Sequence, residues 1–127
     1  MTLKIVITNA YSLQMLDATN RPGGNVWTVH IERLGWAYAH SLCMENEVVS
    51  AIGHEATAQA VSLDLGIEIA ANRINVSAEG ETLLVAQLTG GRLPESKVLT
   101  KDDLADIRFV YFLVTTERVV TRSLDTA

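Results

Sequence analysis

The stretch VVSAIGHEATAQAV, residues 48–61, passes directly from an apolar run into a helical pattern. Val48 to Ala51 is a short apolar piece, and the pattern from His54 to Leu65 predicts a helix that ends at Gly66. Apolar pieces that alternate with helices are typical of α/β proteins. This junction therefore sets the first expectation for the fold.

Strands are predicted where apolar or alternating residues run together, at Leu3–Thr8, Val26–Glu32 and Arg108–Thr115. The last of these runs is almost wholly apolar or aromatic, so we expect it in the interior of a sheet. A hairpin is predicted around a turn at Glu79-Gly80, with strands near Arg73–Ser77 and Thr82–Leu88.

Helical spacing predicts further helices at Ala10–Asp17, at Leu34–Cys43 and behind a cap at Thr100. Residues 116–127 carry little pattern and are expected to form a tail. The prediction is an α/β fold in a single domain, residues 1–127, with a mixed parallel and antiparallel sheet of about five strands flanked by helices.

Composition restricts the class of protein and its partners. Hydrophobic residues make up 48% of the chain and charged residues 20%, which is typical of a globular protein, and no apolar run is long enough to cross a membrane. Cys43 is the single cysteine, so an internal disulfide or thiolate metal cage is excluded and a cytoplasmic location is expected. The net charge of −5 argues against broad binding to DNA or RNA, although a local positive pocket could hold a small anion.

His54, at the entrance of a predicted helix, is the first candidate for chemistry. The helix dipole disfavours a protonated imidazole there and a nearby carboxylate favours it, so such a histidine can titrate near neutral pH and act as a general acid or base. Gly53 before it lets a ligand or another backbone come close. A lone histidine is also often structural or solvated, and position by itself leaves both interpretations open.

The second candidate is GGRLPESK, residues 90–97, directly after a predicted strand. The guanidinium group of Arg92 can bind a phosphate with two parallel hydrogen bonds, and the glycines admit that phosphate to the backbone. The spacing is not that of a Walker-type loop. The alternative is a polar connection between a strand and a helix.

The third candidate is TNAYSLQML, residues 8–16, at the carboxyl end of the first predicted strand. Ligands of parallel sheets tend to bind beyond such ends, and Asn9, Ser12 and Gln14 could hydrogen-bond a ribose, base or phosphate. Helix capping is the alternative for Asn9 and Ser12. Zinc-binding, two-metal and nucleophile-elbow patterns are absent from the sequence, so an enzyme built on these motifs is expected to use no metal, no cofactor and no protein nucleophile.

Three segments in order, ITNAYSLQML, SAIGHEATAQAVSLDLG and NRINV…GGRLPESKVLT, resemble the viral anti-CRISPR ring nuclease family over about residues 3–113. That family was first described as an uncharacterised domain of archaeal viruses and has relatives in bacteria, phages and type III CRISPR loci. The resemblance implies a homodimer that degrades cyclic tetra-adenylate, the second messenger of type III CRISPR systems, without a metal. It also implies action in the cytoplasm, that of the host where a virus or phage encodes the protein.

The resemblance further implies a mechanism and a role for each residue. A ribose 2′-hydroxyl of the ring would attack its own 3′-phosphate and leave linear di-adenylate with a 2′,3′-cyclic phosphate. His54 would protonate the departing 5′-oxygen, and Arg92 would bind the scissile phosphate. Glu95 would support His54 or position the attacking hydroxyl.

The resemblance also implies that Asn9 and Ser12 hold the ligand near the phosphate. Gln14 and Gly53 complete the predicted substrate-binding residues. Two positions depart from the family pattern: Gln14 stands where relatives often have Asn, and Ser96 adds a side chain where relatives usually have Gly. Two alternatives to the enzyme are kept: a sponge or sensor that holds the ring with little turnover, and a protein that keeps only the fold.

Overall fold

The computed structural model describes residues 3–16, 24–90, 102 and 105–122. Their elements, in chain order, are β1 (Lys4–Thr8), the 3-10 turn η1 (Leu13–Met15), β2 (Gly24–Leu34), α1 (Trp36–Glu45), β3 (Glu47–Ser50), α2 (Glu55–Leu65), β4 (Thr82–Gly90) and β5 (Arg108–Arg122). Strands and helices alternate as the sequence predicts, and the short apolar piece before Gly53 forms β3.

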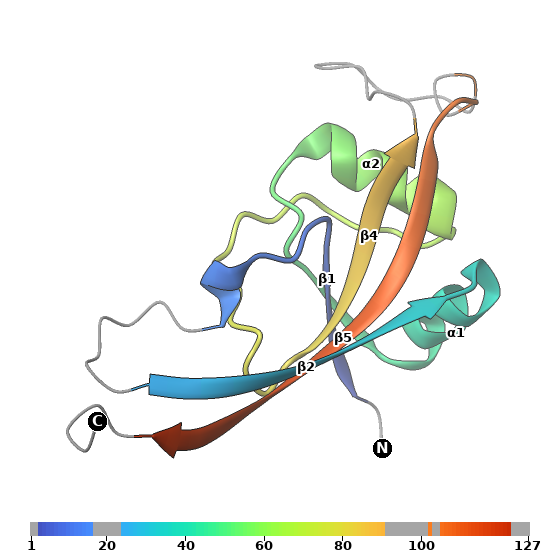
Figure 1. The fold of residues 1–127 in the computed structure, drawn as a ribbon. Helices are drawn as coiled ribbons and strands as arrows, with labels where there is room; N and C mark the ends of the chain where they lie inside the picture. The colour runs from blue at the N-terminus through green and yellow to red at the C-terminus, as the bar shows by residue number, and fades with distance from the viewer. Residues whose placement is uncertain (1–2, 17–23, 91–101, 103–104, 123–127) are drawn as a thin grey trace.

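The strands form one sheet in the order β2-β5-β4-β1-β3 (Figure 1). β1 pairs in parallel with β3 and β4, whereas β5 pairs antiparallel with β4 and β2. This is a single α/β domain with a mixed five-stranded sheet, as predicted. β5 lies between β2 and β4, and its residues Tyr111–Val114, which pair with both neighbours, are all apolar or aromatic.

The central strands of the sheet are buried on both faces, and the two faces are covered differently. Because side chains alternate along a strand, Ile5 and Ile7 of β1 belong to one cluster and Val6 to another. The first cluster is the larger and includes buried residues from both helices: Ala39 and Cys43 of α1, and Ala58, Val61 and Leu65 of α2. The second is covered by the η1 turn and by residues near Ala78. The helices therefore lie on one face of the sheet.

α2 has the ends that the sequence predicts. Its N-cap residue is His54, and it is followed by Gly66 in the left-handed region at φ 77°. The N–H of Gly66 donates to the carbonyl of Ser62, which is a normal way to end a helix. None of the helices in the described residues is long and apolar enough to span a membrane.

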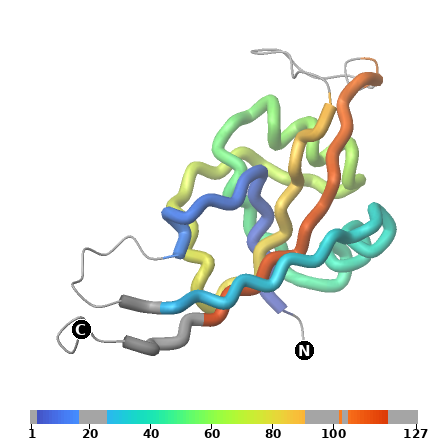
Figure 2. The backbone as a smooth tube through the Cα atoms, viewed as in Figure 1, coloured from blue at the N-terminus to red at the C-terminus, as the bar shows by residue number. Residues whose placement is uncertain are grey.

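The predicted strand at Arg73–Ser77 is wrong. β4 lies between β1 and β5, so both of its edges are hydrogen-bonded and a hairpin partner has no place beside it. Residues 67–78 instead form a connection without strand structure, which runs from the end of α2 back to the start of β4 (Figure 2). A single bridge between Glu79 and Thr116 follows it.

Other boundaries also differ from the prediction. The helix expected at Ala10–Asp17 is reduced to the three residues of η1. β5 continues to Arg122 through much of the expected tail, because Gly24 at the start of β2 pairs with Arg122. The helix predicted behind Thr100 falls largely outside the described residues.

Candidate functional site

The three candidate motifs follow strands that end at the same edge of the sheet. β3, β1 and β4 are neighbouring parallel strands, and their last residues are Ser50, Thr8 and Gly90. Asn9 comes directly after β1, Gly53 and His54 follow β3, and the GGRLPESK segment begins at the last residue of β4. The carboxyl edge of parallel strands is where α/β sheets bind ligands. Arg92, Glu95 and Ser96 themselves lie outside the described residues.

This carboxyl edge is stepped. Ser50 pairs with Ile7 and Thr8 pairs with Val85, so β1 and β3 end together, whereas β4 continues to Gly90 with β5 beside it. Figure 1 shows β4 and β5 extending beyond the end of β1, and α2 lies beside them on the face of the sheet that the helices cover. The ends of the two short strands thus form a ledge beside a taller two-stranded wall.

His54 lies at this ledge as the N-cap residue of α2. Its backbone is extended, at φ −105° and ψ 132°, and its carbonyl accepts the N–H of Ala58 at 3.0 Å. Its side chain is exposed and makes no capping hydrogen bond to the helix. The imidazole is therefore available to a ligand. The first N–H groups of the helix have no intrahelical acceptor, which favours an anion next to it.

The side chain of Arg73 packs against Gly53, and this arginine was not identified from the sequence as a site residue. A Cβ atom built on Gly53 would lie 3.1 Å from Cγ and 3.6 Å from Nε of Arg73, so the arginine side chain packs against the glycine backbone. Arg73 is exposed and stands beside the residue that precedes His54. The only sequence signal for it was its place in the NRINV segment, and it was assigned to a strand that does not form.

Asn72 explains why Arg73 reaches Gly53 from a distant part of the chain. Its N–H donates to the carbonyl of Ile52 at 2.7 Å, and its Nδ2 donates to the carbonyl of Ser50 at 2.7 Å. Both acceptors lie at the end of β3 or in the connection from β3 to α2. Two hydrogen bonds from one residue therefore hold the 67–78 connection against the ledge and fix the position of its neighbour.

The residues after β1 start at the same edge of the sheet, and the η1 turn that follows covers the face opposite the helices. Asn9 is half-buried, whereas Ser12 and Gln14 are exposed. Ser12 is the N-cap residue of η1, yet its hydroxyl makes no capping hydrogen bond. The hydroxyl of Ser12 therefore does not cap the turn, and it is available to a ligand.

Other candidates for chemistry are structural. Burial raises the pKa of the Cys43 thiol to about 11, so it stays protonated and unreactive at neutral pH, as its apolar pattern predicts. His40 stacks on Trp36 and its Nδ1 lies 2.8 Å from the carbonyl of Leu65. In the part of the chain that the structure describes, His, Cys, Asp and Glu side chains do not gather into a group of three that could hold a metal ion.

Comparison with known proteins assigns this arrangement to a family. A family model described as STIV B116-like matches residues 5–111. The chain belongs to the STIV B116-like family. The match to the STIV B116-like model contains all three motifs and Arg73.

Two relatives of this STIV B116-like chain come from archaeal viruses. "Uncharacterized protein 26" of Sulfolobus islandicus filamentous virus (isolate Iceland/Hveragerdi) is 31% identical over 104 residues, covering 80% of this chain and 88% of the relative. The solved structure of B116 of Sulfolobus turreted icosahedral virus superposes with a TM-score of 0.62 at 27% identity, covering 88% of this chain and 98% of B116. The relatives therefore share nearly their whole length with this chain.

Proposed function

We propose that this STIV B116-like protein is a ring nuclease, a metal-independent phosphodiesterase that cleaves cyclic tetra-adenylate. The products would be linear di-adenylate with a 2′,3′-cyclic phosphate, and type III CRISPR signalling would be switched off. The observation that carries the proposal is that His54, Arg73 and Asn9 lie together at the carboxyl ends of the neighbouring parallel strands β3 and β1.

The chemistry asks little of the protein. Because the substrate supplies its own nucleophile, a ribose 2′-hydroxyl, the protein needs only a proton donor, a binding site for the scissile phosphate and in-line geometry. His54 is the proposed donor, since its imidazole is exposed at the helix entrance and has no capping role. Proton donation of this kind contributes roughly 10²–10⁴-fold to a rate.

Phosphate binding is assigned to three groups. The first group is the set of free N–H groups at the start of α2, directly after His54. The second is Arg73, whose side chain packs against Gly53, the residue before His54. Arg92 is the third, since it follows the end of β4 by two residues. Glu95 would support His54 or position the attacking hydroxyl. The polar residues after β1 would hold the ribose or base: Asn9, Ser12 and Gln14.

A homodimer is part of the proposal because the substrate has rotational symmetry. A ring of four identical nucleotides that lies on a two-fold axis presents equivalent phosphates to two identical subunits. Each subunit would then supply one His54 and cleave one bond, which gives two di-adenylates per ring. The proposed location is the cytoplasm, where the ring would be made.

The test is a single-turnover assay with protein in excess over labelled cyclic tetra-adenylate, in EDTA, with products separated by chromatography. We expect EDTA-insensitive formation of di-adenylate cyclic phosphate by the wild-type protein. His54→Ala should lower the rate by about 10²–10⁴-fold and retain binding. His30→Ala is the matched control, because His30 is an exposed histidine on β2, away from the carboxyl ends of β1 and β3.

Three outcomes are informative. Cleavage by His54→Ala at the wild-type rate would refute the assigned proton donor. A ring that stays intact with the wild-type protein but co-elutes with it would replace the enzyme by a binding protein. A ring that neither breaks nor binds would reject the ligand altogether.

A further inference from the structure

A pocket of about 500 Å³ lies where β2 ends, on the other side of β4 from the ledge. Leu34, the last residue of β2, pairs with Tyr111, whereas β5 begins at Arg108. Within the described strands, Phe109 and Val110 consequently have β4 on one side and no strand on the other. The pocket opens at this uncovered part of β5, and its volume is in the range of small-molecule sites.

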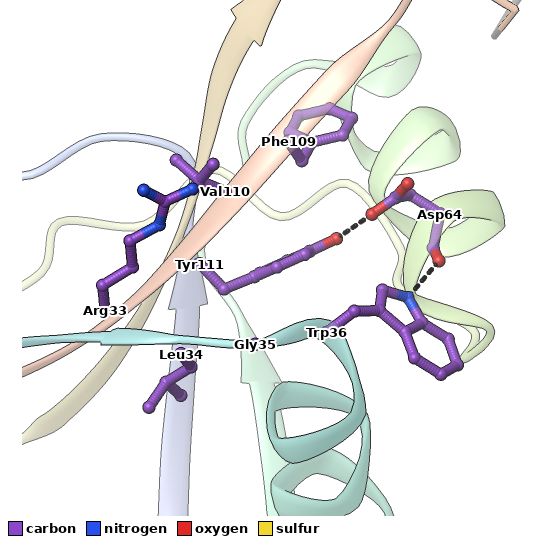
Figure 3. A pocket seen from close by; sticks show the side chains of 8 residues that line it. All are labelled: Arg33, Leu34, Gly35, Trp36, Asp64, Phe109, Val110 and Tyr111. Atoms are coloured by element: carbon purple, nitrogen blue, oxygen red, sulfur yellow. Dashed lines mark hydrogen bonds between the residues drawn. The ribbon is translucent and has the colours of Figure 1, made fainter.

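Aromatic rings form one wall of this pocket, and one of them is held in place. The indole N–H of Trp36 donates to the backbone carbonyl of Asp64 at 2.7 Å, and the ring stacks on His40 with centroids 4.9 Å apart and planes 10° apart. Trp36 is nevertheless 49% exposed. Figure 3 shows Phe109 and Tyr111 on the same side of β5 as Trp36. A fixed ring with open surface is a platform on which a flat or apolar group can stack.

A carboxylate without a cation lies next to these rings. The hydroxyl of Tyr111 donates to Oδ2 of Asp64 at 2.5 Å. Burial, together with the hydrogen bond and negative charge of Asp64, raises the pKa of Tyr111, so the hydroxyl stays protonated and continues to donate. Across the described side chains, Asp64 forms no ion pair with a Lys, Arg or His. One of its two carboxylate oxygens therefore remains available as an acceptor.

Arg33 marks the far end of the pocket. Figure 3 shows its guanidinium beside Val110, across β5 from Asp64. The pocket consequently has an acidic aromatic end and a basic end, and the two ends favour different groups. A partly buried, unpaired carboxylate is unfavourable until a cation pairs with it, which makes the Asp64 end the one that gains most from a ligand.

We propose that the Asp64 end of this pocket binds an organic cation of the guanidinium type, such as an arginine side chain. A guanidinium group is planar and weakly hydrated, so it can stack on Trp36 while its N–H groups donate to the free oxygen of Asp64. This fits the pocket better than a phosphate, which Asp64 would repel. The site is separate from the ledge and does not depend on the proposed nuclease function.

The experiment follows the indole N–H signals of Trp27 and Trp36 in ¹⁵N-labelled protein, with Trp27→Phe used to assign the two signals. The two probes are N-acetyl-L-arginine amide, which represents an arginine within a partner protein, and agmatine, which represents a free small guanidinium compound. We expect a saturable shift of the Trp36 signal only. Binding of both probes would mean that the guanidinium group suffices, and binding of agmatine alone would identify a free metabolite as the source.

Two variants test whether the charge of Asp64 holds the probe. Asp64→Asn keeps an acceptor for Tyr111 and removes the charge, so it should weaken binding by about tenfold or more without unfolding the protein. Arg33→Gln removes a repulsive charge and should leave binding unchanged or tighter. The proposal is overturned if neither probe shifts the Trp36 signal or if Asp64→Asn binds the probes as the wild type does. Adenosine monophosphate serves as an anionic comparison: if it binds instead and Arg33→Gln abolishes that binding, the proposal is also overturned.

Discussion

Gly66→Ala tests whether the left-handed end of α2 is a property of the protein in solution. A Cβ at this position would meet only ring atoms of His40, at 3.7 Å, which is an ordinary contact. The steric term is therefore negligible, and the whole cost comes from holding alanine at φ 77°, about 1–2 kcal/mol of the free energy of unfolding. For 127 residues the entropy of unfolding is about 0.27 kcal/mol/K, so Tm should fall by about 4–7 °C.

The assay is thermal and urea-induced unfolding followed by circular dichroism, with two comparison variants. Gly66→Asn should recover at least half of the lost stability, because asparagine tolerates the left-handed region. Gly80→Ala has the same kind of backbone, at φ 74°, with nothing within 4 Å, so its loss should be similar. A loss below about 0.3 kcal/mol for Gly66→Ala would show that the helix does not end this way, and one above about 3 kcal/mol would require a steric contact that the structure does not contain.

Two further predictions concern the ledge and the core. Arg73→Ala should weaken binding of cyclic tetra-adenylate by about tenfold or more, because a charge-assisted contact to a phosphate would be lost. The Tm should change little because Arg73 is exposed. Isothermal titration calorimetry measures the affinity, and an unchanged affinity would remove Arg73 from the site. Cys43 should react with iodoacetamide at pH 8 only slowly until denaturant is added, since burial raises its pKa from 9.0 to about 11. Rapid labelling of the native protein would contradict the burial of this thiol. The raised pKa also means that the folded state favours the protonated thiol, so the contribution of Cys43 to the free energy of unfolding should be lost as the pH rises from about 9 to 11.

The parts of the site that lie on locally patterned segments could be predicted from the sequence. β1, β3 and α2 were recognisable because apolar runs, helical spacing and a glycine stop are local signals. These signals correctly placed Asn9, Gly53 and His54 at the ends of elements. The hairpin prediction failed because a turn signal at Glu79-Gly80 says nothing about whether the next strand has two partners elsewhere in the sheet.

Arg73 and the Asp64 pocket could not be predicted, since each depends on contacts between residues far apart in the chain. Arg73 reaches Gly53 only because its neighbour Asn72 bonds to Ser50, which lies 22 residues before Asn72 in the chain. Tyr111 meets Asp64 because β5 packs under the end of α2. Neither pair has a spacing or composition that distinguishes it in the sequence.

By itself the sequence determined the strands β1 and β3, the helix α2 and the chemical groups available at their ends: an imidazole at a helix entrance, a glycine before it, and polar side chains after a first strand. The tertiary structure decided that these groups share one edge, through the parallel order β3-β1-β4, and that β2 stops short and leaves a pocket beside β5. The reason is physical. Helix and strand propensities act over a few neighbouring residues, whereas strand order and pockets arise from packing and hydrogen bonding between segments that only folding brings together.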